Sequence, residues 1–262
     1  MLMRSTWILK PETTATLPRS YRLELSKRLH TQAGIELGSE TIPSTTFSGL
    51  LGKAQAAEGF ITFSPDEFYR LSLSGLQESA SKAIATLNLT DTFDFLGTEF
   101  QVIDREDETT SYEALYHQYV ANEPEPERQM VLSFLSPTAF SQNRTYLPLP
   151  VPTLLFRSWL ERWNHFSSVY LGGDELIRYL GEAVALSRHR IQTQSFPIYK
   201  GNVSGFVGTA TLSILYRSDP LLAQVANLLV HYGQFAGSGM KTRLGMGKTN
   251  LQIPEMVQRT VS

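Results

Sequence analysis

The sequence predicts an α+β protein made of two tandem ferredoxin-like (RRM-like) domains. The chain of 262 residues suits two domains of ordinary size. Its patterning predicts the ferredoxin-like order strand, helix, two strands, helix, strand, and predicts it twice. A segment rich in Pro and Glu between the two rounds has the composition of an exposed connection. We therefore divide the chain into an N-terminal domain, 1–125, and a C-terminal domain, 126–262.

The first round begins with a strand over residues 5–10, which a proline ends. An amphipathic helix is predicted next, over residues 18–31. Tyr21, Leu25 and Leu29 recur along it at spacing i, i+4, i+8 and should face the core. The other elements expected in this domain are strands over 45–51, 59–64 and 92–104, and a long helix from Asp66 to about Leu87.

Residues 105–128 form the acidic connection, with a short helical piece around residues 112–119. The second round repeats the order of elements. The two halves share no strong sequence repeat, so the duplication is inferred from that order alone. The expected elements are a strand over 129–136, helices over 153–164 and 173–182, strands over 184–196 and 205–217, a helix over 219–232 and a short strand over 249–253.

Charge is distributed unevenly along the chain. The formal net charge is −2, yet residues 183–254 carry +6 and residues 1–34 carry +4, while residues 91–127 carry −10. A basic surface that faces a polyanion, with an acidic surface turned away from it, would produce this split. The alternative is that the acidic connection only lies on the surface and the basic ends have no special partner. We favour the first interpretation, in which a basic surface binds a polyanion.

Composition excludes several classes of protein. The hydrophobic share of 42% and the charged share of 18% are those of a globular protein. No apolar run approaches the length of a membrane span, and the N-terminus lacks a secretory signal pattern, so we expect a cytoplasmic protein with no membrane partner. The absence of Cys removes disulfides, thiolate metal ligands and Cys nucleophiles, and it fits an intracellular protein.

The five histidines are His30, His117, His165, His189 and His231. None lies at a metal-ligand spacing from another, so we expect neither a metal nor another cofactor. A metal-free cleavage of a phosphodiester needs only a base near the attacking hydroxyl, an acid near the leaving oxygen and cations on the phosphate. Imidazole suits proton transfer because its pKa lies near neutrality, although a structural role is the usual one for a single histidine.

A glycine-rich stretch, residues 237–248, holds four glycines, three cations and no acid. Successive N–H groups in such a turn can form an anion-binding nest, and Lys and Arg side chains suit phosphates. A mobile surface loop is the simpler alternative. The sequence Gly247-Lys248-Thr249 is not a nucleotide P-loop, because that motif needs a glycine at the position of Thr242 and a following helix. The residues of interest are Gly237, Gly239, Lys241, Arg243, Gly245, Gly247 and Lys248.

Five pieces of the chain form a further pattern. They are Leu29-His30 at the end of the first helix, Thr46-Phe47-Ser48-Gly49-Leu50, Leu135-Ser136-Pro137-Thr138-Ala139-Phe140, Leu149-Pro150-Val151-Pro152 with Arg162-Trp163-Asn164, and Gly205-Phe206-Val207-Gly208 with the glycine-rich stretch. Each piece alone is weak. Together and in this order, along nearly the whole chain, they resemble the repeat-processing endoribonucleases of the Cas6 family, within the RAMP superfamily of CRISPR proteins.

The resemblance implies two ferredoxin-like domains side by side with a cleft between them. It also implies a metal-independent endoribonuclease that cuts CRISPR precursor RNA within its repeats to produce guide crRNAs. The RNA 2′-OH attacks the adjacent phosphate in such enzymes and leaves a 2′,3′-cyclic phosphate. Members that use an acid–base histidine usually carry it on the first helix or just after it, where His30 lies. A lysine shortly after the helix often assists; Lys53 is the nearest candidate by position, and Lys27 is its rival.

CRISPR repeat RNA is the expected partner. Arg188, Arg190 and Lys200, together with the glycine-rich stretch, should hold its phosphates, and a folded stem would be recognised largely by shape. Subunits of a CRISPR effector complex and a second copy of the chain are further candidate partners. The alternative function is a non-catalytic RAMP subunit that binds crRNA in an effector complex, which needs no acid–base residue at position 30. A third interpretation is a ferredoxin-like protein that binds no RNA.

Overall fold

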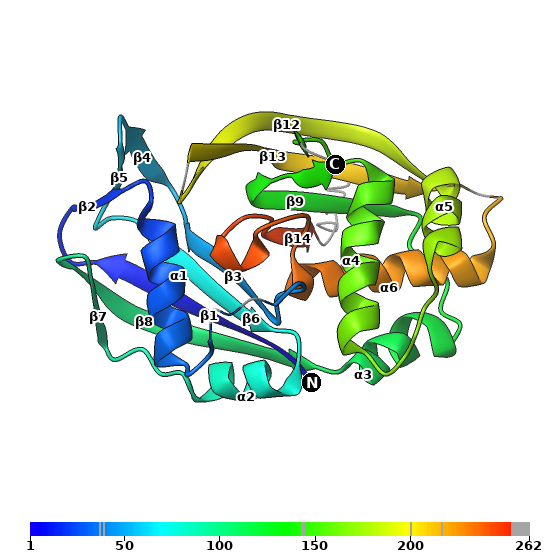
Figure 1. Ribbon diagram of the computed structural model, residues 1–262, viewed down its shortest axis with the longest axis horizontal. Coiled ribbons are helices and arrows are strands. Elements are labelled where there is room, and N and C mark those ends of the chain that lie inside the picture. Colours follow the sequence, from blue (N-terminus) through cyan, green and yellow to red (C-terminus); the bar gives the residue numbers. More distant parts are fainter. Residues whose placement is uncertain (37, 39, 143–144, 200, 216, 253–262) are drawn as a thin grey trace, which may run out of the picture.

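The computed structural model describes residues 1–36, 38, 40–142, 145–199, 201–215 and 217–252. Within these ranges each half of the chain forms a large antiparallel sheet, and the two halves lie side by side (Figure 1). Helices α1 and α2 lie beside the N-terminal sheet, and helices α4, α5 and α6 lie beside the C-terminal sheet. The α+β fold class is thereby confirmed.

The N-terminal sheet has the strand order β3-β6-β1-β8-β7, and its neighbours pair antiparallel. Without the short edge strand β7, this places the first strand between the third and the fourth, as in a ferredoxin-like domain. The elements are β1 (Leu2–Pro11), α1 (Tyr21–Gln32), β3 (Thr45–Leu51), β6 (Tyr69–Gly75), α2 (Glu78–Thr86), β7 (Thr92–Phe95) and β8 (Thr98–Thr110).

The long helix predicted after residue 66 is wrong. Its first part is the strand β6, which pairs with β1 and β3, and the helix α2 begins only at Glu78. Tyr69, Leu71 and Leu73 recur at every second position of β6 and are buried, which is the period of a strand rather than of a helix. Strand β6 therefore provides the third strand of the ferredoxin-like order.

The strand predicted over 59–64 lies outside the main sheet. It is β5 (Phe60–Phe63), which pairs with β2 (Ala15–Pro18) and β4 (Ala54–Ala57) in a small separate sheet. The single strand predicted over 92–104 is instead the hairpin β7–β8. Short accessory strands of this kind are hard to place from patterning, because each buries few side chains.

The C-terminal sheet has the strand order β12-β13-β9-β14, again with the first strand between the third and the fourth. Its predicted elements are all present, and most boundaries agree within two residues. Strand β13 begins four residues before the predicted strand, α6 ends four residues after the predicted helix, and residue 253 lies outside the described residues. The elements are β9 (Gln129–Thr138), the hairpin β10 (Phe140–Gln142) and β11 (Thr145–Leu147), α4 (Pro152–Phe166), α5 (Asp174–Ala183), β12 (Val184–Ile198), β13 (Gly201–Ile214), α6 (Pro220–Ala236) and β14 (Thr249–Gln252).

The acidic connection is shorter than predicted. Residues 105–110 continue β8 and pair with β1. After them come α3 (Tyr112–Tyr116) and a π-helical turn, η1 (His117–Ala121). Leu115 and Val120 are buried in the C-terminal core, so this segment packs with the second half of the chain. The predicted domain boundary, which falls just before β9, stays a prediction.

Hydrogen bonds at the end of α6 join the two halves. Thr46 Oγ1 of β3 donates to Phe235 O at 2.8 Å, and Arg4 Nη1 of β1 donates to Gln234 O at 3.1 Å. The last carbonyls of a helix have no intrahelical partner, so these bonds satisfy groups that would otherwise be left open. They also place the glycine-rich stretch, which follows α6 directly, against the N-terminal half.

Candidate functional site

The glycine-rich stretch contacts α1 through a short 3-10 turn, η2 (Thr242–Leu244). Ser26 Oγ on α1 donates to Arg243 O at 2.6 Å. Ser26 lies one helical turn before His30 on the same face of α1. The helix that carries the candidate histidine and the stretch that carries the candidate cations are therefore in direct contact.

The glycines of this stretch are needed for its own packing. All four have positive φ, between 65° and 105°. A Cβ on Gly247 would lie 2.1 Å from Ser238 O, and one on Gly239 would lie 2.3 Å from Ala139 O. Only glycine fits at these two positions. Gly245 is different, because the nearest atom to a Cβ there would be 3.4 Å away, which is ordinary contact.

Several backbone N–H groups of the stretch point to acceptors inside the protein. Gly247 N donates to Pro137 O at 3.0 Å, and Ser238 N donates to Gly247 O at 2.8 Å. Met240 N donates to Ala139 O at 3.0 Å. These groups are not free to bind a phosphate, so the predicted anion nest does not form at these positions.

Helix α4 holds the beginning of the stretch. Trp159 Nε1 donates to Gly237 O at 3.1 Å, and the buried Arg162 donates from Nη2 to Gly239 O at 2.5 Å. Ser158 Oγ accepts from Gly239 N at 3.3 Å. Side chains of α4 and the backbone near the end of β9 thus fix the path of the glycines from both sides.

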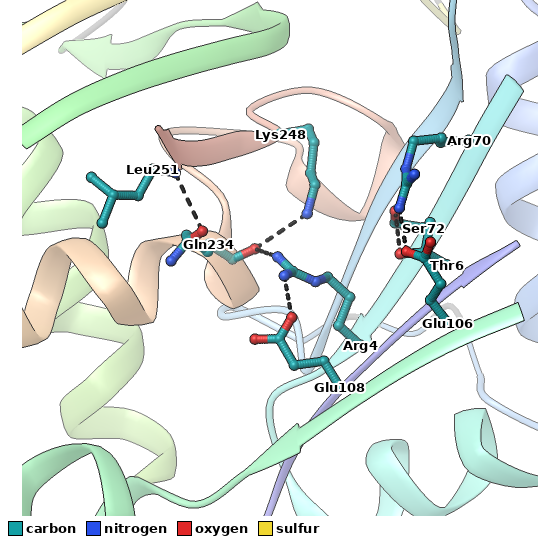
Figure 2. A network of polar contacts seen from close by, with 9 residues as sticks. All are labelled: Arg4, Thr6, Arg70, Ser72, Glu106, Glu108, Gln234, Lys248 and Leu251. Carbon is teal, nitrogen blue, oxygen red and sulfur yellow. Dashed lines mark hydrogen bonds and ion pairs between the residues drawn. The ribbon is translucent and has the colours of Figure 1, made fainter. Parts of the chain in front are cut away.

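Lys248, the last residue of the glycine-rich stretch, points its side chain into the molecule, toward Gln234 at the end of α6 (Figure 2). The residue is 8% exposed, and its Nζ donates to Gln234 O at 3.3 Å. Arg4 donates to the same oxygen and also pairs with Glu108 of β8. Burial, and then the charge of Arg4, lowers the pKa of Lys248 well below its usual range. The visible contact of Lys248 is structural, and its RNA contact stays a prediction.

A cleft of about 1040 Å³ lies between α1, the glycine-rich stretch and the tip of the hairpin β12–β13. Elements from both halves of the chain therefore line it. Lys27 and Lys241 bring ammonium groups to the cleft, and Tyr199 brings a ring that is 90% exposed. Glu24 and Glu36 also line it, and the rest of the lining is largely apolar.

His30 is fully buried, at 0% exposure, between α1 and β3. Its Nδ1 lies 2.7 Å from Ser26 O, and its Nε2 lies 2.7 Å from Thr45 Oγ1. A carbonyl oxygen can only accept, so Nδ1 carries the proton and Nε2 accepts from the Thr45 hydroxyl. Burial lowers the pKa of His30, against the raising effect of the bond to Ser26. His30 is thus a neutral imidazole whose two nitrogens are both bonded within the protein.

The model of the family described as CRISPR-associated endoribonuclease Cas6 matches residues 132–249, from β9 through the glycine-rich stretch to the start of β14. Over these residues the chain is similar to the Cas6 family. A CRISPR-associated endoribonuclease Cas6 of Mycobacterium tuberculosis is 33% identical to the chain over 129 residues. That alignment covers 48% of this chain and 39% of the M. tuberculosis protein, so the shared segment spans about two fifths of that relative.

Solved Cas6 structures share the fold over both halves of the chain. Thermus thermophilus Cas6 has a TM-score of 0.72 and 21% identity, over 96% of this chain and 98% of that one. A Cas6 product complex has a TM-score of 0.72 and 20% identity, over 97% and 100% of the two chains. Together with the strand orders, this similarity confirms two ferredoxin-like sheets in this chain.

Lys53, Arg188 and Arg190 do not line the cleft between α1 and the glycine-rich stretch. Lys53 follows β3, with its side chain 87% exposed and its Nζ 3.6 Å from Glu67. Arg188 and Arg190 are exposed on β12, and Lys200 lies outside the described residues. The structure therefore brings Lys27 and Lys241 to one cleft, while Lys53 is not among the residues that line it.

In the part of the chain that the structure describes, no group of three or more His, Asp or Glu side chains is arranged to hold a metal ion. No helix within the described ranges is long and apolar enough to cross a membrane. Thr249 begins the strand β14 rather than a helix, which agrees with the rejection of a P-loop.

Sequence patterning missed Arg22. Its Nε atom is buried without a hydrogen-bond partner, and its side chain lies next to Gly245 of the glycine-rich stretch. The signal was present in the sequence, because Arg22, Ser26 and His30 recur at spacing i, i+4, i+8 beside the apolar stripe of the helix. The apolar stripe identified the core face of α1, and this polar stripe marks the face toward the glycine-rich stretch.

Proposed function

We propose that this protein is an endoribonuclease that cuts CRISPR precursor RNA within its repeats and releases guide crRNAs. The hydrogen bond from Ser26 to Arg243, at 2.6 Å, carries the proposal. It joins the helix with the candidate acid–base residues to the basic stretch that ends the matched Cas6 segment. Both elements line the same cleft.

An RNA strand suits the chemistry of that cleft. Lys27 and Lys241 supply positive charge for phosphates, and the exposed ring of Tyr199 offers a face on which a base can stack. Since Glu24 and Glu36 repel phosphates, we place the RNA backbone on the side of the two lysines.

We propose that the rest of the repeat is held by the remaining basic residues of the C-terminal half. Arg188 and Arg190 are exposed on β12. With Lys200, Arg243 and the glycine-rich stretch, they would contact phosphates and so supply affinity that falls as the salt concentration rises. Lys248, which Figure 2 shows in contact with Gln234, would have to leave that contact to bind a phosphate.

We propose a reaction that needs no metal ion. The RNA 2′-oxygen attacks the adjacent phosphorus, the bond from phosphorus to the 5′-oxygen breaks, and a 2′,3′-cyclic phosphate and a 5′-hydroxyl result. A base removes the proton of the 2′-OH, and an acid gives a proton to the 5′-oxygen. We assign proton transfer to His30, which must first break its contact with Thr45, and we assign charge stabilisation to Lys27 or Lys53.

The test mixes purified protein, in excess EDTA, with a labelled RNA that carries the repeat of the CRISPR array in the source genome. We expect one cut within each repeat and a 2′,3′-cyclic phosphate end. A scrambled repeat and a repeat with 2′-O-methyl sugars are the controls, and neither should be cut. An absolute need for a divalent ion in the chemical step, on RNA that is already folded, would overturn the mechanism.

The second candidate is a non-catalytic RAMP subunit that binds crRNA in an effector complex. The burial of His30, with both ring nitrogens bonded, favours it. The same assay separates the two functions. Tight binding of the repeat RNA without any cut, over a range of pH, would support the subunit and exclude the endoribonuclease.

Three further proposals accompany this function. We place the protein in the cytoplasm, we take residues 1–125 and 126–262 as its domains, and we keep a homodimer and effector-complex subunits as candidate partners. The molar mass of the purified protein, with and without repeat RNA, would decide between a monomer and a homodimer. Separate expression of the two segments would show whether each folds.

A further inference from the structure

The side chain of Arg22 passes between two glycines that have positive φ. A Cβ on Gly49 of β3 would lie 2.7 Å from Arg22 Nε, and one on Gly245 would lie 3.4 Å from Arg22 Cδ. Beyond them the guanidinium group lies over the rings of Phe196, at 5.8 Å, and of Tyr21, at 5.4 Å. Elements α1, β3 and β12 and the glycine-rich stretch thus hold this cation in one place.

The described residues supply no anionic partner for the guanidinium group of Arg22. Arg22 Nε is buried without a hydrogen-bond partner, and within the described residues no hydrogen bond or ion pair reaches the guanidinium group. Arg22 also lies in the first turn of α1, where the helix dipole disfavours a cation. A half-buried cation without an acceptor costs stability unless a ligand provides one.

We propose that Arg22 is a phosphate-binding residue for the RNA backbone. Its fork of N–H donors fits two oxygens of one phosphate, and its stacked position keeps the fork pre-organised. The inference rests on the proposed RNA-binding function. Eight residues separate Arg22 from His30 along α1, which is about 12 Å at 1.5 Å per residue. Arg22 therefore holds a phosphate that flanks the scissile one.

Such a contact contributes to affinity more than to the chemical step. Arg22→Gln should weaken binding of a 2′-O-methyl repeat RNA, which cannot be cut, by about tenfold or more at low salt. The slope of log affinity against log salt should fall by about 0.7 to 0.9, the value for one lost phosphate contact. The single-turnover rate at saturating protein on cleavable repeat RNA should change less than threefold.

Arg28→Gln is the matched control. Arg28 lies on the same helix, is exposed, and stacks on Phe93 at 5.0 Å. Its replacement by Gln therefore removes the same charge and a similar ring contact, but at a site away from the glycine-rich stretch. It should keep the affinity and the salt slope of the wild type. Arg22→Lys keeps the charge without the fork, and it should bind with an intermediate affinity and a slope near that of the wild type.

Gly49→Ala tests the position of the Arg22 side chain without removing its charge. It keeps every cation, but its Cβ would meet Arg22 Nε and move the side chain. It should weaken RNA binding as Arg22→Gln does, in protein whose thermal melting shows it folded. An unchanged affinity and slope in Arg22→Gln, or a weaker affinity with an unchanged slope, would overturn the proposal. Failure of the wild type to bind the RNA at all would overturn the proposed function itself, and this inference with it.

Discussion

At the scale of single residues, the position of His30 decides between two roles. Its ring donates to Ser26 O and accepts from Thr45, and it is fully buried. A structural histidine has these properties. A catalytic one needs only that its Nε2 contact with Thr45 can open toward the RNA, because the proton on Nδ1 is held by a carbonyl that remains in place.

We expect His30→Ala to slow single-turnover cleavage by on the order of a hundredfold or more, the scale of lost acid–base catalysis. Affinity for the 2′-O-methyl repeat RNA should change little. The substitution also removes the bonds of the imidazole to Ser26 O and to the buried Thr45 hydroxyl, so stability should fall by about 1–3 kcal/mol.

Thr45→Val is the control that separates the two roles. It removes the hydroxyl that bonds Nε2 without changing the imidazole. If His30 acts in catalysis, Thr45→Val should cut at or above the wild-type rate while melting at a lower temperature. If His30→Ala cuts at the wild-type rate, His30 is structural, and Lys27 becomes the leading candidate.

At the scale of elements, the glycine-rich stretch combines two functions in different residues. Gly239 and Gly247 fit the backbone of β9 and of the stretch itself. Lys241 and Arg243 lie at η2, where they remain partly exposed, and Arg243 also donates to Gly38 O at 3.1 Å. The glycines set the path of the backbone, and Lys241 and Arg243 remain partly exposed, where they can meet a ligand.

We expect these two groups of residues to respond differently to substitution. Gly247→Ala should lower the melting temperature sharply, since its Cβ would lie 2.1 Å from Ser238 O. The double variant Lys241→Ala/Arg243→Ala should melt near the wild type, bind repeat RNA more weakly and lower the salt slope by about two units. Gly245→Asp has room for its Cβ but must adopt a strained positive φ, so it should melt lower than the wild type as well as weaken binding through its charge.

Thermal melting and salt titration of RNA binding measure these effects. If the double variant and Gly245→Asp both keep the wild-type affinity while folded, the stretch is structural only, and the RNA lies elsewhere on the protein.

At the scale of the whole molecule, part of the charge split along the chain is cancelled in space. Arg4 pairs with Glu108, and Arg70 pairs with Glu106, so acids of β8 neutralise cations of β1 and β6 (Figure 2). The acidic segment is therefore not simply turned away from the basic one. Cations that keep their charge for a polyanion lie at the cleft and on β12.

Buried neutral histidines should make the whole fold sensitive to acid. Burial lowers the pKa of His231 to about 4, while its ring stacks on Tyr119 at 4.1 Å and its Nδ1 lies 3.0 Å from the Tyr119 hydroxyl. An unfolded histidine titrates near 6.5, so between about pH 4 and 6.5 the unfolded chain binds more protons than the folded one. Stability should be full above about pH 6.5 and decline as the pH falls toward 4.

His231→Phe tests this expectation. It keeps a ring for stacking on Tyr119 and removes the titrating group, so its free energy of unfolding should fall less steeply than that of the wild type between pH 6.5 and 4. His30 contributes a slope of the same sign in both proteins, since its pKa is also lowered. Equal slopes would mean that Glu127, 4.0 Å from His231 Nε2, compensates the protonated ring.

The sequence alone determined which segments are amphipathic and in what order they come. Tyr21, Leu25 and Leu29 identified α1 and its core face, because helical periodicity is a local property of the chain. The order of the elements in the second half, and the motifs that resemble the Cas6 family, were likewise available without coordinates. The boundaries of most elements followed from the same local signals.

The tertiary structure decided what each polar residue touches. Ser26 and Arg243 are 217 positions apart in the chain, and only folding brings them within 2.6 Å. It also buried His30, turned Lys248 inward to Gln234, and left Arg22 Nε without a partner. The burial of a side chain and its hydrogen-bond partners depend on residues distant in sequence, and local periodicity carries no record of those contacts. For the same reason β6, whose partners β1 and β3 lie elsewhere in the chain, resembled a helix until its pairing was seen.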